Sequence, residues 1–289
     1  MYIIWIPTWK CNYAGKWKCP YCDYIWKNNG LEVDCFQGYR KLVFDRELTA
    51  KEWLDFVNSL EPSHFDFTGG EPLLYDGFLE LINNLSDKHV WAITSNTSLL
   101  PLYLDKLNLE KCISWTASYH PYAPYPYSSP AWFIKRIKEL KSRGVPVTIT
   151  IVAYPPMLHL LDELVEYFER VCTVNVNLFY NRFFDWKEHP DLLERVKKHI
   201  DKTAFGQKWY KLELKKKDKV KMCNAGKKYA VFMPNGDVIR CYSGWVIDYD
   251  RYKIGNITDS NFKFLSKEKE CDIPCIFPCD YQQREVYAR

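Results

Sequence analysis

Three cysteines near the start of the chain have a spacing that could hold an inorganic group. Cys11, Cys19 and Cys22 have the spacing C-x7-C-x2-C and directly follow the apolar residues 2–7. Three thiolates on one loop can hold three corners of a [4Fe–4S] cube, which leaves the fourth iron open to a substrate. The alternatives are a zinc knuckle and three unrelated buried thiols. Zinc favours a fourth Cys or His, and Cys35 is the only such residue nearby. Taken alone, this cysteine loop favours iron–sulfur over zinc only modestly.

A second cysteine group lies in the last third of the chain. Cys223 and Cys241 flank the turn sequence at residues 234–237. Three more cysteines complete the group with the spacing C-x3-C-x3-C: Cys271, Cys275 and Cys279. The opening apolar run is too short for a secretion signal, and no run of 18 apolar residues could span a membrane. We therefore expect a cytoplasmic protein in which many of the 11 cysteines are metal ligands rather than disulfide partners.

Length and charge limit the number of domains and the kinds of partner that we expect. The 289 residues are 47% hydrophobic, which is enough for one large domain or for one domain with a smaller companion. The 40 basic and 36 acidic residues give a net charge of +4, so we do not expect a nucleic-acid partner. The one basic run, residues 211–221, is typical of a solvated loop.

Apolar stretches with strand character alternate with amphipathic helical patterns. The expected strands are residues 2–7, 64–68, 90–94, 113–118, 146–152 and 173–179. Helix starts are indicated by Thr49 with Glu52, a capping box, by Asp76, and by Ser129 followed by Pro130. Residues 27–46 are polar and mixed, and they have no firm assignment.

Six alternations with short connections predict an α/β fold built on a parallel sheet with right-handed crossovers. Six units are fewer than the eight of a closed TIM barrel, so a partial (β/α)6 barrel or a doubly wound sheet both fit. In either fold the active site lies at the carboxyl ends of the strands. The segments at these ends are the cysteine loop and residues 69–72, 95–96, 118–127 and 181–182.

The strand–helix alternation stops beyond residue 186. A helical stretch at residues 190–201 is followed by an expected hairpin, residues 229–233 and 238–241. We predict two domains, the partial barrel at residues 1–186 and a small hairpin and helix domain at residues 187–289. The second domain has too few apolar residues for a large core, so it should pack on the first.

These features together resemble the radical SAM superfamily. The cysteine loop follows the first strand, Tyr21 lies between its last two cysteines, and Gly69-Gly70-Glu71-Pro72 closes the second strand. The resemblance covers residues 1–182. It implies that S-adenosylmethionine chelates the open iron and that the GGE motif binds its amino group. The usual loop is C-x3-C-x2-C, so the seven-residue first gap is a departure, although variants with a long first gap exist in the family.

The resemblance also implies the residues of the site. The expected contacts of S-adenosylmethionine are Tyr21, Gly69, Gly70, Glu71, Pro72, Ser95, Asn96, Ser118 and Val152. For the three Ser and Asn side chains, ordinary strand-end capping is the alternative. We expect the three loop cysteines and His120 to be catalytic, with His120 as a proton donor or base or, alternatively, bonded within its own loop.

Substrate contacts are expected beyond the strand ends. The tyrosine- and proline-rich loop at residues 119–127 should face the substrate, since tyrosines offer flat hydrogen-bonding surfaces. Arg182 and Asp185 could bind a charged substrate, or they could form surface salt bridges.

The C-terminal part resembles the SPASM or twitch domain. Cys223 is followed after twelve residues by Gly236 and after four more by Cys241, and residues 254–257 read Ile-Gly-Asn-Ile. A full SPASM domain holds two clusters on seven or more cysteines, so the five present here imply the twitch form with one auxiliary [4Fe–4S] cluster. Four of the five cysteines would saturate it. We expect the remaining cysteines to be plain thiols: Cys35, Cys112 and Cys172.

The implied function is that of a radical SAM oxidoreductase or maturase. Such an enzyme reductively cleaves S-adenosylmethionine to a 5′-deoxyadenosyl radical, which abstracts a substrate hydrogen, and the auxiliary cluster aids net oxidation or bond formation. A flavodoxin or ferredoxin would supply electrons. The substrate is expected to be a peptide or protein, or alternatively a small molecule such as a sugar, amino acid or nucleoside.

The domain content of the chain limits the possible reactions, and a non-catalytic function is the remaining alternative. The chain starts almost at its first strand, so we expect no leader-peptide-binding domain, which weakens the case for a peptide maturase working alone. No cobalamin-binding domain is expected. The other class is a non-catalytic iron–sulfur electron carrier, but a carrier has no use for an open iron or for Glu71.

Overall fold

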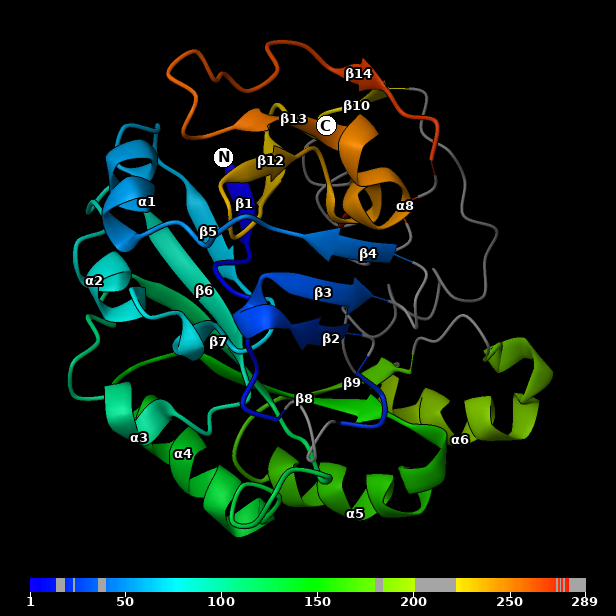
Figure 1. Ribbon diagram of the computed structural model, residues 1–289. Helices are drawn as coiled ribbons and strands as arrows, with labels where there is room; N and C mark the ends of the chain where they lie inside the picture. The colour runs from blue at the N-terminus through cyan, green and yellow to red at the C-terminus, as the bar shows by residue number, and fades with distance from the viewer. Residues whose placement is uncertain are drawn as a thin grey trace.

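The computed structural model describes residues 1–13, 19–22, 24–35, 40–179, 184–200, 222–273, 275, 277 and 279–280. Its main feature is a sheet in which six parallel strands lie in the order β1-β5-β6-β7-β8-β9 (Figure 1). These strands are β1 (Tyr2–Trp5), β5 (His64–Phe67), β6 (Val90–Ser95), β7 (Cys112–Ser118), β8 (Val147–Ala153) and β9 (Val174–Leu178). All six strands predicted from the sequence are confirmed. The fold is an α/β fold of the partial TIM-barrel type, as predicted.

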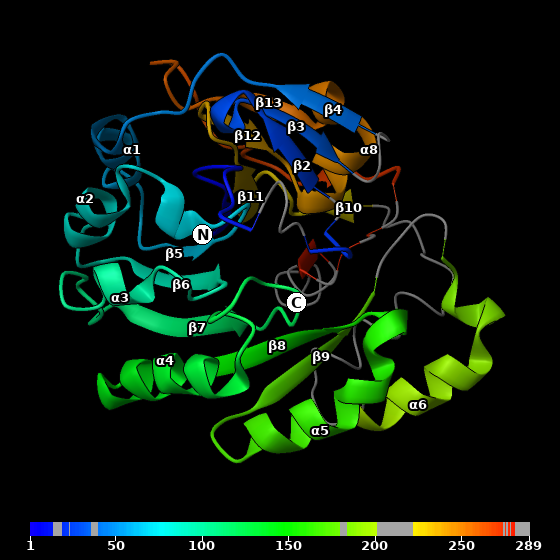
Figure 2. The same ribbon diagram turned by 60° about the horizontal axis from the view of Figure 1, so that its bottom comes forward.

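Helices cover the outer face of this sheet (Figure 2). They are α1 (Ala50–Val57), α2 (Phe78–Asn83), α3 (Leu100–Tyr103), α4 (Pro130–Ser142), α5 (Leu158–Glu169) and α6 (Pro190–Ile200). The strands alternate accordingly, since Ala117, Ile149 and Ile151 are buried in the core that the helices share, while the residues between them face the inside of the barrel. No helix in the described residues is both long and apolar enough to cross a membrane.

The predicted helix starts are confirmed in two cases and wrong in one. Thr49 and Glu52 form both halves of a capping box at α1, and the Ser129 side chain accepts a hydrogen bond from the Trp132 N–H at α4. Asp76 does not cap α2. The chain first makes a short 3₁₀ turn, η3 (Pro72–Leu74), so α2 starts later and has Gly77 at its N-cap without a side-chain cap.

Residues 27–46, which have no assignment from sequence, contribute to a small antiparallel sheet. Its strands are β2 (Tyr24–Lys27), β3 (Glu32–Cys35) and β4 (Arg40–Val43). Val33, Cys35 and Leu42 are buried in a second core on the other side of β1, together with residues of α8 (Tyr242–Tyr252). Unlike β1 and β5, this segment mixes polar and apolar residues without a clear period, so its strands are recognised only from this core.

The C-terminal hairpin continues the main sheet. Its strands are β11 (Tyr229–Phe232) and β12 (Asp237–Ile239), which are antiparallel as predicted, and β13 (Lys253–Asn256) pairs with β12. β11 pairs in parallel with β1, and Tyr229 lies opposite Tyr2. The full order is therefore β13-β12-β11-β1-β5-β6-β7-β8-β9. A separate pair joins β10 (Met222–Cys223) to β14 (Lys269–Glu270). The predicted boundary at residue 186 stays a prediction, although both sides of it contribute to one sheet.

Trp5 is the packing centre where these two parts meet. Its side chain is fully buried. Its ring lies 4.7 Å from Trp53 on α1, 5.2 Å from Phe65, 4.9 Å from Phe67 on β5 and 5.7 Å from Phe232 on β11. Aromatic pairs at these separations add to the free energy gained by burial, so β1 holds the barrel and the hairpin strands in one core.

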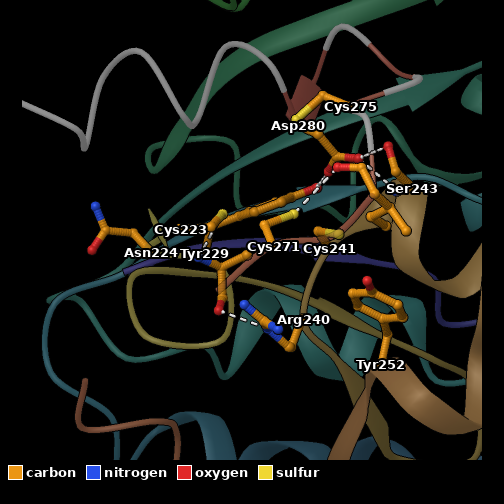
Figure 3. A pocket seen from close by; sticks show the side chains of 12 residues that line it. Cys223, Asn224, Tyr229, Arg240, Cys241, Ser243, Tyr252, Cys271, Cys275 and Asp280 are labelled. Carbon is orange, nitrogen blue, oxygen red and sulfur yellow. Dashed lines mark hydrogen bonds between the residues drawn. The ribbon is translucent and has the colours of Figure 1, made fainter. Parts of the chain in front are cut away.

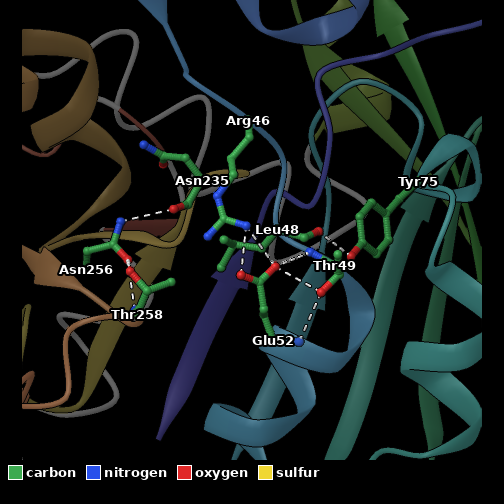
Figure 4. Close-up of polar contacts among 8 residues, drawn as sticks. All are labelled: Arg46, Leu48, Thr49, Glu52, Tyr75, Asn235, Asn256 and Thr258. Carbon is green, nitrogen blue, oxygen red and sulfur yellow. Dashed lines mark hydrogen bonds and ion pairs between the residues drawn. The ribbon is translucent and has the colours of Figure 1, made fainter.

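The segment before α1 also holds the hairpin turn in place. Figure 4 shows Leu48 of this segment with Tyr75, and Asn235 of the turn with Asn256. The Leu48 N–H donates to the Pro234 carbonyl at 2.8 Å, while the Tyr75 hydroxyl donates to the Leu48 carbonyl at 2.6 Å. On the hairpin side, the Asn256 amide donates to the Asn235 carbonyl at 3.0 Å. The start of α1 therefore anchors both the barrel and the C-terminal part.

We predict that Thr49→Ala lowers the free energy of unfolding by about 1 kcal/mol, because the Thr49 hydroxyl accepts the Glu52 N–H and its loss leaves that donor uncapped. Urea denaturation followed by circular dichroism measures the change. The control is Lys51→Ala in the same helical turn, which removes only an exposed ion pair with Asp55 and should have a smaller effect. Equal effects of the two substitutions would contradict the role of the cap.

Candidate active site and second cysteine group

The GGEP segment lies directly against the residues that lead into the cysteine loop. The Gly70 N–H donates to the Thr8 carbonyl at 3.2 Å, and the Glu71 N–H donates to the Lys10 carbonyl at 2.7 Å. A Cβ on Gly70 would come 2.1 Å from the Lys10 carbonyl oxygen, and Gly69 has a φ of +123°. Only glycine permits this approach and this backbone conformation. The second strand end is thus joined by backbone hydrogen bonds to the segment that precedes Cys11.

The Glu71 carboxylate joins two neighbouring strand ends. It is 1% exposed and accepts hydrogen bonds from the Leu73 N–H at 3.1 Å, the Ser95 hydroxyl at 2.8 Å and the Asn96 N–H at 2.8 Å. Burial raises the pKa of this carboxyl group to about 7, against the lowering effect of these donors. The Ser95 hydroxyl therefore makes the strand-end contact that is the alternative to binding S-adenosylmethionine. Pro72, the next residue, begins η3 and is buried.

Asn12, which the sequence reading did not single out, fixes the start of the cysteine loop. The Asn96 side-chain amide donates to the Asn12 oxygen at 2.9 Å, and the Asn12 amide donates to the Ser98 hydroxyl at 2.7 Å. The Ser98 hydroxyl in turn donates to the Asn96 oxygen. The loop is thus tied to the end of β6 directly after Cys11. Residues 14–18 of the long first gap lie outside the described residues, so the effect of the unusual spacing beyond Asn12 stays a prediction.

The three loop cysteines and Glu71 lie near enough that the charges of Glu71, Cys19 and Cys22 act on the Cys11 thiol. Cys19 is buried and Cys11 and Cys22 are partly buried, and the Cys22 N–H donates to the Cys19 carbonyl at 2.9 Å. Burial raises the pKa of the Cys11 thiol to about 12, and the charges of Glu71, Cys22 and Cys19 add to that effect. Among the described residues, no three His, Cys, Asp or Glu side chains are grouped to hold a metal ion. A [4Fe–4S] cube does not require the three thiolates to converge on one ion, because each thiolate binds its own iron. Three sulfur donors on one loop fit such a cube.

His120 lies against this loop. Its Nδ1 is 2.9 Å from the Tyr21 hydroxyl and 3.4 Å from the Cys19 sulfur. Burial lowers the pKa of His120 to about 4, so the ring is neutral near pH 7. Beyond it, the Tyr21 ring lies 6.3 Å from Tyr122 and 5.6 Å from Tyr154, which gives the loop an aromatic border.

The remaining predicted residues lie on the inner face of the last strands. Ser118 pairs with Thr150, and Val152 pairs with Asn177. The sequence reading missed Asn177, although the alternation Val-Asn-Val-Asn-Leu in β9 places it on the inner face. Its side-chain oxygen is buried and has no hydrogen-bond partner among the described residues. It is therefore a candidate ligand contact.

The two predicted substrate-binding charges are not seen as a pair. Arg182 lies outside the described residues. The Asp185 carboxylate accepts a hydrogen bond from the Lys187 N–H at 2.9 Å and so caps the 3₁₀ turn η5 (Trp186–Glu188). Its role toward a substrate stays a prediction.

Four cysteines of the second group line one pocket (Figure 3). The cysteines are Cys223, Cys241, Cys271 and Cys275, and the pocket is also lined by Arg240, Tyr229, Tyr252 and Asp280. A hydrogen bond between the thiols of Cys223 and Cys271 lowers the pKa of Cys271 below its usual value. Cys279, the fifth cysteine, does not line this pocket. Its thiol instead contacts the hydroxyl of Tyr229, which does line the pocket.

A buried carboxylate and a buried cation hold the pocket's shape. Asp280 accepts hydrogen bonds from the Tyr229 hydroxyl at 2.6 Å and from the Tyr242 N–H at 2.9 Å, and it also bonds Ser243 at the start of α8. The Cys241 sulfur accepts the Gly244 N–H at 3.2 Å. Arg240 donates to two backbone carbonyls and lies 5.7 Å from the centre of the Tyr252 ring.

Comparisons with known proteins agree with this geometry at the level of the fold. No family model matches the sequence. A 7-carboxy-7-deazaguanine synthase from Clostridium acetobutylicum is 32% identical over 101 residues, which are 35% of this chain and 41% of that protein. The match thus spans less than half of that relative.

Two solved structures share the fold over most of the chain. The structure of anSMEcpe with bound AdoMet has a TM-score of 0.61 and 14% identity, with coverage of 90% of this chain and 76% of that one. Streptococcus suis SuiB bound to S-adenosylmethionine has a TM-score of 0.57 and 15% identity, with coverage of 90% and 64%. This chain therefore has the fold of two proteins whose structures contain S-adenosylmethionine.

We predict that Gly70→Ala reduces the iron bound per chain after anaerobic reconstitution, because the new Cβ would push away the backbone at Lys10 and with it the start of the cysteine loop. Iron analysis and the visible absorption spectrum measure the effect. The matched control is Gly144→Ala, where a Cβ meets no atom within 4 Å but the φ of +78° is strained. The control should cost stability, by roughly 1–2 kcal/mol, and leave iron binding intact. Full iron binding by Gly70→Ala would contradict the prediction.

Proposed function

We propose that this chain is a radical SAM enzyme whose catalytic centre is the cysteine loop. The observation that carries the proposal is the pairing of Glu71 with Lys10 and of Gly70 with Thr8, which sets a GGEP segment beside the start of the three-cysteine loop at the carboxyl ends of β1 and β5. A [4Fe–4S] cluster held there would supply the electron that cleaves S-adenosylmethionine to a hydrogen-abstracting 5′-deoxyadenosyl radical. The shared fold with two proteins solved with S-adenosylmethionine supports the same conclusion.

The residues of the chain have distinct roles in this proposal. Cys11, Cys19 and Cys22 hold the cluster. Glu71 and Asn96 position the loop from the neighbouring strand ends, and Asn96 does so through its bond to Asn12. The backbone at Gly69 and Gly70 binds the amino group of S-adenosylmethionine. Further contacts with it or with the substrate come from the inner face and its border: Tyr21, Ser95, Asn96, Ser118, Val152 and Asn177.

We also propose a second, auxiliary [4Fe–4S] cluster in the four-cysteine pocket. The thiols of Cys223, Cys241, Cys271 and Cys275 line it, and the buried guanidinium of Arg240 would balance the negative charge of a thiolate-bound cluster. β1 and β11 run in parallel with Tyr2 opposite Tyr229. The pocket contains Tyr229, the first residue of β11, whereas the cysteine loop follows the end of β1. The two clusters would therefore lie toward opposite ends of one strand pair.

A peptide is the favoured substrate. Structures with a related fold contain peptides: anSMEcpe was solved with the Kp18Cys peptide, and SuiB with the precursor peptide SuiA. The aromatic border at Tyr122 and Tyr154 offers side chains of the type that bind peptides, since tyrosine combines flat apolar area with a hydrogen-bonding group. A flavodoxin or ferredoxin would be the reducing partner.

The alternative is oxidation or rearrangement of a small molecule. The relative with the higher sequence identity, at 32%, is a 7-carboxy-7-deazaguanine synthase, whose name denotes a small heterocyclic product. An aromatic border is also suited to stacking a planar ring.

We predict that the reconstituted protein, given dithionite and S-adenosylmethionine without oxygen, releases 5′-deoxyadenosine. Cys19→Ala should abolish the release, because it removes one cluster thiolate. The matched control is Cys172→Ala, which makes the same change outside both cysteine groups and should keep the activity. Wild-type protein that yields no more 5′-deoxyadenosine than Cys19→Ala would refute the enzyme proposal.

We predict about eight irons per chain in the reconstituted wild type, since two cubes hold four each. Cys241→Ala and Cys275→Ala should lower this number toward about four, because both thiols line the pocket. Cys279→Ala should leave it near eight. A wild-type value of about four would remove the auxiliary cluster, and a loss with Cys279→Ala alone would reassign its fourth ligand.

A further inference from the structure

We propose that His120 is a positioning residue that donates a hydrogen bond from Nδ1 to the Cys19 sulfur and thereby favours the reduced state of the cluster on the cysteine loop. The inference rests on the proposed function, since it requires a cluster bound to Cys19. In this proposal His120 affects the reduction potential of the cluster and does not transfer a proton to or from a substrate.

The geometry fixes the imidazole relative to the sulfur. Nδ1 lies 3.4 Å from the Cys19 sulfur and 2.9 Å from the Tyr21 hydroxyl. The Tyr21 ring is nearly parallel to the imidazole, at 15°, and the Tyr13 ring meets it edge-on at 84°. Both tyrosines belong to the same loop as Cys19. His120 is therefore held in place by the loop whose sulfur it faces.

The position of the proton follows from the chemistry of the three atoms. A thiolate that binds iron carries no proton, so its sulfur can only accept a hydrogen bond. A protonated imidazole carries a hydrogen on both nitrogens and so donates from Nδ1 in any case, whereas a neutral imidazole has one N–H, on Nδ1 or on Nε2. With the hydrogen on Nδ1, the ring donates toward a negative sulfur and a hydroxyl oxygen. With the hydrogen on Nε2, Nδ1 could only accept from Tyr21. The negative sulfur favours the first tautomer, because hydrogen bonds to charged acceptors are the stronger ones.

Reduction of the cluster by one electron, taken from a low-potential one-electron reductant such as dithionite, increases the negative charge on the cluster and its thiolates. A donor aimed at one of these sulfurs stabilises the more negative state more than the oxidised state, and hydrogen bonds to the sulfurs are one of the factors that set such potentials. Loss of the Nδ1 donor should therefore make reduction harder without removing a ligand.

The first test measures the midpoint potential of the SAM-responsive EPR signal in the full-length, reconstituted protein. We expect His120→Leu to lower the equilibrium constant for one-electron reduction of the cluster about tenfold. This corresponds to a downward shift of the midpoint potential by about 59 mV, and the iron content should be unchanged. His120→Asn, which restores an N–H near the position of Nδ1, should recover part of the shift. The matched control is Tyr122→Phe, in the same aromatic border but without a contact to Cys19 among the described residues, and it should keep the wild-type potential. A wild-type potential in fully loaded His120→Leu would overturn the proposal.

The second test needs no substitution and therefore does not depend on the variants folding. All six histidines of the chain are among the described residues, and of these six only His120 makes a hydrogen-bond contact with a loop cysteine. In wild-type protein labelled with ¹⁵N-histidine, ENDOR of the reduced cluster should show a ¹⁵N coupling and an exchangeable proton. The absence of both would overturn the proposal. Failure of the proposed function would look different, because the wild type would then show no SAM-responsive signal at all.

Discussion

The close approach of two backbone segments is the constraint on which the candidate active site depends. Gly69 and Gly70 lie so near residues 8–10 that a single Cβ would collide with a carbonyl oxygen, and two backbone hydrogen bonds hold the segments together. These two hydrogen bonds fix the backbone at residues 8 and 10 and so restrict the backbone conformation of Cys11, which follows. The position of Cys11 is therefore set by the sheet, and the cysteine loop begins from a rigid point.

A buried carboxylate extends this constraint to the next strand. Glu71 accepts three hydrogen bonds, two of them from the end of β6, and Asn96 then bonds Asn12 inside the cysteine loop. Burying a carboxylate is costly unless its oxygens are satisfied, so this connected network favours one arrangement of the two strand ends and the loop. The same network explains how a loop with an unusually long first gap can start in a defined way, since its first residues are fixed before the extra length begins.

The two cysteine groups are related through β1. β11 pairs with β1 on the side opposite β5, and Trp5 packs against aromatic rings from both neighbours. The hairpin strands, and with them the pocket of four cysteines, are thus part of the same sheet as the cysteine loop. If both cysteine groups bind clusters as proposed, this shared sheet would fix the distance between the clusters.

The sequence by itself determined the six parallel strands, the capped starts of α1 and α4, the hairpin and the two cysteine groups, because hydrophobic period, capping residues and ligand spacing are local properties. The sequence did not predict β2 to β4 or α8, because these elements are stabilised by packing into a shared core and have no clear local pattern. Its prediction of Asp76 as the N-cap of α2 is wrong. Only the tertiary structure shows the contacts of Asn12 with Asn96 and of His120 with Cys19. Only it shows that four cysteines of the second group line one pocket and that Cys279 is not among them. Each of these depends on contacts between residues distant in sequence, which no local pattern encodes.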